Sequence, residues 1–133
     1  MTVRALALFA VLVAAGCDSA SETCVPAYEA PSCDPLYEPT FDNFHRETLL
    51  KKCAVAGGSC HASEGAASLA YEDADHAYAM FIDQGLVVPN EPECSTLVHR
   101  LEADSSSSMP PGAPLSEAER CVVKLWIARG ASR

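Results

Sequence analysis

The chain has 133 residues, enough for one small domain, and its 18 acidic and 9 basic side chains give a net charge of −9 at pH 7. This acidic balance, with dispersed basic residues, excludes a nucleic-acid partner held through phosphate contacts. No set of nucleophile, base and orienting residue stands out, so we expect an electron carrier or binding module rather than an enzyme.

Residues 1–16 are expected to form a secretory signal peptide. Arg4 supplies a short positive region, and an apolar run over 5–13, too short to span a bilayer, ends in small residues before Cys17. The Ala-Ala-Gly-Cys ending resembles the lipobox of bacterial lipoproteins. That resemblance implies that Cys17 is lipidated and becomes the mature N-terminus. We therefore expect an exported protein that its lipid holds on a bacterial membrane, facing the periplasm or the cell exterior.

Residues 17–40 are expected to form a linker followed by a Pro/Cys-rich segment. The stretch after Cys17 is small and polar, as is usual between a lipid anchor and a domain. Four prolines between positions 26 and 39 then disfavour regular secondary structure.

Helical patterns dominate the chain after these prolines. Apolar residues recur at helical spacing and predict helices at 40–52, at 73–83, from about Pro92, and from Ser116 to Gly130. Proline suits the first turn of the third helix, and a capping box opens the last one. Strand signals are almost absent, so residues 41–133 are predicted to form a small all-α domain.

The most distinctive motif is Cys53 followed, after six residues, by the dipeptide Cys60-His61. A cysteine directly before a histidine is typical of c-type haem attachment, in which thiols bond to the haem vinyl groups and the imidazole binds iron. The common motif has two residues between its cysteines, so two arrangements are open. Either Cys60 alone forms a thioether, or the intervening residues loop out and Cys53 forms a second one. The other interpretation is a Cys53–Cys60 disulfide, with His61 an ordinary polar residue.

Six cysteines remain besides the lipidated one, an even number that permits complete pairing in an exported chain. The simplest pairings are Cys24 with Cys33, within the proline-rich segment, and Cys94 with Cys121, between the last two predicted helices. If both disulfides form, the two cysteines of the haem-like motif share one fate, as haem thioethers or as a third disulfide.

Met109 is the candidate for the second iron ligand, because a thioether is a known axial partner of histidine. It precedes two prolines, which predict a rigid loop. A lone methionine is otherwise an ordinary core residue. Alternative ligands are His45, His76 and His99, each of which we expect to be a surface or helix histidine.

The segment from Pro39 to Ala131 resembles small cytochrome-c-like domains of exported and lipid-anchored bacterial proteins. The matching features are, in order, PTFDNF, the Cys…Cys-His element, DADHAYAMF, VVPNEPECSTLVHRLE, MPPGAPLSEAE and VKLWIARGA. The resemblance implies a cytochrome c fold in which the first and last helices cross, with Trp126 and Leu125 packing the last helix toward Phe44 and Leu49.

The resemblance also implies that Cys60 is a thioether donor, His61 the proximal iron ligand and Met109 the distal one. The leading hypothesis is therefore a membrane-tethered c-type cytochrome that binds haem through these residues and Cys53, and passes single electrons between redox partner proteins. The alternative is a haem-free, disulfide-stapled lipoprotein of the same fold that acts as a binding or scaffold module.

Overall fold

The computed structural model describes residues 24–25, 31–55, 60–63, 65, 68–102 and 107–133, and every regular element within these ranges is a helix. The all-α prediction is therefore confirmed for this part of the chain. The predicted signal peptide, Cys17 and most of the expected linker lie outside the described residues. No helix in the described part is long and apolar enough to cross a bilayer.

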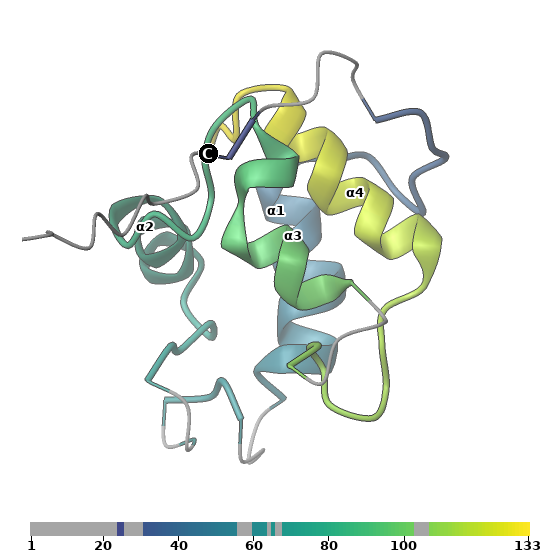
Figure 1. The fold of residues 1–133 in the computed structure, drawn as a ribbon. Coiled ribbons are helices and arrows are strands. Elements are labelled where there is room, and N and C mark those ends of the chain that lie inside the picture. Colours follow the sequence, from purple (N-terminus) through teal and green to yellow (C-terminus); the bar gives the residue numbers. More distant parts are fainter. Residues whose placement is uncertain (1–23, 26–30, 56–59, 64, 66–67, 103–106) are drawn as a thin grey trace, which may run out of the picture.

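The helical elements are, in chain order, α1 (Phe41–Phe44), η1 (His45–Cys53), α2 (Ala74–Asp83), η2 (Pro92–Cys94), α3 (Thr96–Leu101) and α4 (Glu117–Ala128). Figure 1 shows α1, α3 and α4 grouped together, with α2 to one side of them. All four predicted helical segments are present, within a residue or two of their expected ends. The third segment is not one continuous helix, because the structure divides it into η2 and α3.

The first helix is continuous from α1 into η1. It begins after Thr40, whose side chain accepts a hydrogen bond from the Asn43 backbone N–H at 3.3 Å. Along η1 the helix is a π-helix, and at its end the Ala54 N–H donates to the Leu49 carbonyl at 2.7 Å, five residues back. π-Helices are rare and are frequent at functional sites. This one ends at Cys53, the first residue of the haem-like motif.

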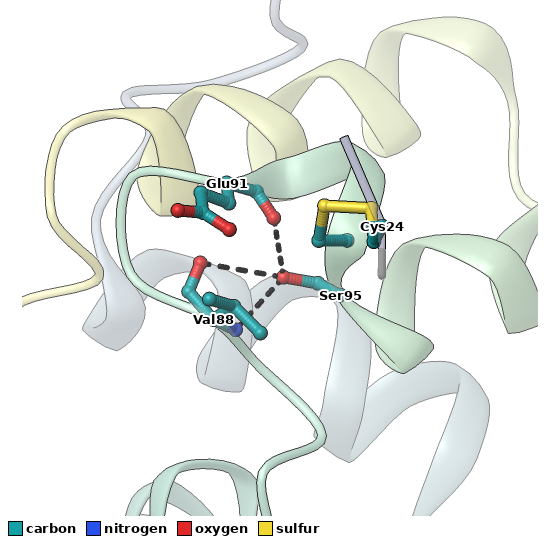
Figure 2. Close-up of a disulfide and its surroundings, with 5 residues drawn as sticks. Cys24, Val88, Glu91 and Ser95 are labelled. Atoms are coloured by element: carbon teal, nitrogen blue, oxygen red, sulfur yellow. Dashed lines mark hydrogen bonds between the residues drawn. A yellow bond between two sulfur atoms is a disulfide. The ribbon is translucent and has the colours of Figure 1, made fainter. Parts of the chain in front are cut away.

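The predicted third helix is divided at Ser95, between η2 and α3. The backbone of Ser95 is extended, with φ −87° and ψ 122°, and its side chain is fully buried. The hydroxyl accepts a hydrogen bond from the Val88 N–H at 2.9 Å and donates one to the Glu91 carbonyl at 2.9 Å (Figure 2). These bonds stabilise the turn before α3 and explain why one continuous helix does not form.

The predicted capping box of α4 is present. Ser116 Oγ accepts a hydrogen bond from the Glu119 N–H at 3.3 Å, and the Glu119 carboxylate accepts one from the Ser116 N–H at 2.9 Å. The helix ends before Gly130, whose φ of 97° lies in the left-handed region that favours glycine.

The core lies where α1 and α4 meet. The ring of Trp126 packs against Phe41 and Phe44, with centroid distances of 5.3 and 6.1 Å. Phe81 of α2 adds a third contact, 6.3 Å from Phe44. The expected packing of Trp126 toward Phe44 is thus confirmed, and the first and last helices are in direct contact.

All four cysteines predicted to form disulfides are bonded, but both predicted pairings are wrong. Cys24 is bonded to Cys94 and Cys33 to Cys121, over separations of 70 and 88 residues. The predicted pairings joined cysteines of one segment or of two consecutive predicted helices. The segment before α1 instead lies against α4, to which a backbone hydrogen bond of 3.1 Å joins it. Each of its cysteines therefore reaches a different helix, and the longer loops constrain the unfolded chain more.

Removing a long-range disulfide is expected to destabilise this fold. In a Cys33→Ala/Cys121→Ala variant the free energy of unfolding should fall by about 2–5 kcal/mol, because the unfolded chain regains the freedom of a long loop. Urea denaturation followed by circular dichroism measures the change. A non-reducing peptide map of the unaltered protein checks the pairing, and a peptide linking Cys24 to Cys33 would contradict it.

Candidate functional site

An apolar cavity of about 530 Å³ lies between η1, α3 and the loop that leads into α4. This volume is within the range of sites for cofactors and other small molecules. Most of its lining is hydrophobic, including Leu49, Leu86, Leu97 and Leu115. Large apolar ligands are the chemical class that such a lining accommodates.

The cavity brings together the four residues predicted to bind a cofactor. Cys53, Cys60, His61 and Met109 all line it, although they come from the end of η1, the loop after it, and the loop before α4. The three alternative histidines do not line it. His76 and His99 are exposed on helices, and His45 is buried in η1.

The imidazole of His61 is held in one orientation. Its Nδ1 lies 2.8 Å from the Leu69 carbonyl oxygen. A carbonyl oxygen only accepts hydrogen bonds, so Nδ1 must carry the hydrogen and donate it. In the neutral ring the lone pair is then on Nε2. A backbone carbonyl bound to the second ring nitrogen is the usual environment of a metal-ligating histidine.

The backbone brings Cys53 next to His61 despite the enlarged spacer. The His61 N–H donates a hydrogen bond to the Cys53 carbonyl oxygen at 3.1 Å. In one regular helical turn such a bond joins residues four apart, which is the separation of the first cysteine and the histidine in the common haem motif. Here the same bond joins residues eight apart. The two ends of the enlarged spacer are therefore in contact, and residues 56–59 between them lie outside the described residues.

Cys53 and Cys60 both carry thiols, and no disulfide joins them. The Cys53–Cys60 disulfide of the alternative interpretation is therefore not formed in this structure. The side chain of Cys53 is half-buried, whereas that of Cys60 is exposed. Burial raises the pKa of the Cys53 thiol to about 11, with a further contribution from the nearby Cys60.

Met109 is half-buried and packs against the hydrophobic core. Its backbone N–H donates a hydrogen bond to the Arg100 carbonyl at 2.6 Å, which ties the loop before α4 to α3. Pro110 and Pro111 follow it and also line the cavity. The rigid loop expected from the two prolines thus presents its methionine at the cavity.

The charged side chains among the described lining residues are cationic. Lys52 and Arg100 line the cavity, and no aspartate or glutamate of the described part does. Lys52 also pairs with the buried Glu119, at 2.6 Å. Burial alone would raise the pKa of Glu119, but hydrogen bonds from Lys52 and Ser116 outweigh it and lower the pKa below its usual value. A ligand that suits this cavity is apolar in its body and carries anionic groups at its edge.

Sequence reasoning missed Lys52, Arg100 and Tyr71 as site residues. The two cations are indistinguishable in sequence from ordinary solvated side chains of a helix. Tyr71 belongs to no motif, and its burial at the cavity depends on contacts with η1 and α2 that no local pattern encodes.

Comparisons with protein-family models, with curated proteins and with solved structures find no match to this chain.

The Cys53 thiol is expected to react slowly with alkylating agents. We expect iodoacetamide to label it slowly at pH 7 in a Cys17→Ser/Cys60→Ser variant without attached cofactor, and the rate to rise about tenfold per pH unit toward pH 11, because burial disfavours the thiolate. The same variant unfolded in guanidinium is the control, with an ordinary thiol pKa of about 8.5. If the labelling rate of the folded protein instead stops rising near a pH of about 8.5, the result would contradict the burial of Cys53.

Proposed function

We propose that this protein is an exported, lipid-anchored c-type cytochrome that carries single electrons. The observation that carries the proposal is the convergence of His61, Met109 and two thiols on one apolar cavity. These residues come from segments far apart in the chain, and each is of the type that c-type haem attachment uses.

The donor set fits haem in three respects. The Nδ1–H of His61 is already bonded to a backbone carbonyl, which leaves Nε2 for iron. Met109 supplies a thioether from a separate loop that lines the same cavity. Arg100 suits a carboxylate of the kind that haem carries, and Lys52, which pairs with Glu119, adds a second positive charge, in a lining without acidic residues over the described part.

Bound haem would supply an iron centre that gains and loses one electron. His61 and Met109 would both hold the iron, and two protein ligands would keep substrates from it, which suits a carrier rather than a catalyst. The thiols of Cys60 and Cys53 would each add across a vinyl double bond. Sulphur bonds to one vinyl carbon and the thiol hydrogen goes to the other, so the addition needs no oxidant.

The cytochrome-c-like fold is part of this proposal. The contact of α1 with α4 through Trp126 and Phe44 supports it, since crossing of the first and last helices is what the resemblance implies. The cavity is lined by Phe44 of α1 and by Met109, Pro110 and Pro111 of the loop before α4.

We also propose that a lipid on Cys17 holds the protein on a bacterial membrane, where it exchanges electrons with redox partner proteins. The net charge of −9 favours partners with a basic docking surface.

A haem-free binding module of the same fold is the second candidate. It is favoured by the two disulfides, which tie the segment before α1 to η2 and α4 without any cofactor. This candidate also predicts that Cys53 and Cys60 form a disulfide in the exported protein.

A pyridine haemochrome spectrum distinguishes the two candidates. Full-length protein exported from a host with cytochrome c maturation machinery is expected to show the α-band of a c-type haem. Met109→Ala should keep the α-band but remove the proposed methionine ligand. Added imidazole should then bind the iron more readily than in the unaltered protein. The exposed His99→Ala is the matched control and should leave the spectrum unchanged. Absence of the α-band from the unaltered protein would exclude the cytochrome proposal.

A further inference from the structure

The side chain of Tyr71 lies flat against the imidazole of His61. The two ring centroids are 4.5 Å apart and the planes are inclined by only 16°. Tyr71 is 6 % exposed, and its ring is also close to Phe81, with a centroid distance of 5.0 Å. The imidazole is therefore stacked on a ring that is itself fixed in the core.

Two backbone hydrogen bonds fix the position of Tyr71. Its N–H donates to the His61 carbonyl at 2.8 Å, so the two stacked residues are also joined through their main chains. Its carbonyl oxygen accepts a hydrogen bond from Nε2–H of His45 at 2.8 Å. His45 is 8 % exposed and belongs to η1, the helix that ends at Cys53. The stack is thus tied to the same helix that carries the first cysteine.

Stacking and hydrogen bonding restrict the imidazole in different ways. The bond from Nδ1–H to the Leu69 carbonyl selects the ring nitrogen that stays available, and still allows the ring to tilt about that bond. The stacked face of Tyr71 prevents this tilt. Together they set both the tautomer and the plane of His61.

We propose that Tyr71 and His45 are positioning residues for His61: the Tyr71 ring sets the plane of the imidazole, and His45 holds Tyr71 in place. This proposal rests on the proposed function for its consequence at iron. The stack itself is a property of the chain and can be tested whether or not haem is attached.

The stack has an electronic consequence as well as a geometric one. The face of an aromatic ring is electron-rich and attracts positive charge. If His61 holds iron, its imidazole would carry more positive charge when the iron is oxidised than when it is reduced, so the Tyr71 ring would favour the oxidised state. Loss of the ring is expected to favour reduction, with a change of roughly two- to five-fold in the equilibrium constant.

The experiment compares Tyr71→Phe, which keeps the aromatic face, with Tyr71→Leu, which removes it, in the exported full-length protein. The first readout is the NMR signal of the His61 ring protons, measured in the reduced state if haem is attached. We expect Tyr71→Leu to lose the upfield ring-current shift and Tyr71→Phe to keep it. The second readout is the midpoint potential, which should rise in Tyr71→Leu and stay near that of the unaltered protein in Tyr71→Phe.

A second pair of variants covers the case in which Tyr71→Leu fails to fold. His45→Gln keeps an N–H donor for the Tyr71 carbonyl, whereas His45→Ala removes it. We expect His45→Ala to move the His61 signals in the same direction as Tyr71→Leu, and His45→Gln to restore them.

The outcomes separate this proposal from the proposed function. Unchanged His61 signals in folded Tyr71→Leu, or equal signals in His45→Ala and His45→Gln, would overturn the positioning role even in a haem-containing protein. If the protein carries no haem, the cytochrome proposal fails, and the NMR comparison still decides whether Tyr71 and His45 orient His61.

Discussion

The hydrogen bond from the His61 N–H to the Cys53 carbonyl is the constraint on which the site depends. It closes an enlarged spacer so that the end of η1 and the Cys60-His61 dipeptide meet at one side of the cavity. The His61–Tyr71 stack and the His45 hydrogen bond reinforce the same junction, because they join the segment after the spacer back to η1.

The opposite side of the cavity is built by α3 and the proline loop that carries Met109. This side is attached to the body of the protein through the core contact of α1 with α4 and through two disulfides that the segment before α1 makes with η2 and α4. The protein therefore assembles both sides of the cavity from its own contacts. Such preorganisation lowers the cost of ordering side chains when a large ligand binds.

Much of the fold could be predicted from the sequence, because local signals determine it. Helical spacing located the helices, and the Ser116–Glu119 capping box marked the start of α4. His61 and Met109, which the sequence indicates as candidate ligands through the Cys-His motif and the proline loop, line the same cavity. The disulfide partners were mistaken, because pairing depends on where an extended segment lies and not on nearness in sequence. Tyr71 and Arg100 could not be predicted as lining residues for a similar reason, because tertiary contacts bring them to the cavity.

The most direct test of the central claim is the intact mass of the exported full-length protein, measured under denaturing, non-reducing conditions after export from a host that matures c-type cytochromes. A haem attached through Cys60, with or without Cys53, survives denaturation, so we expect a mass greater than that of the processed chain by one haem. Cys60→Ala together with Cys53→Ala should abolish this increase. A mass equal to that of the processed chain, with Cys53 linked to Cys60 in a non-reducing peptide map, would exclude covalent haem attachment.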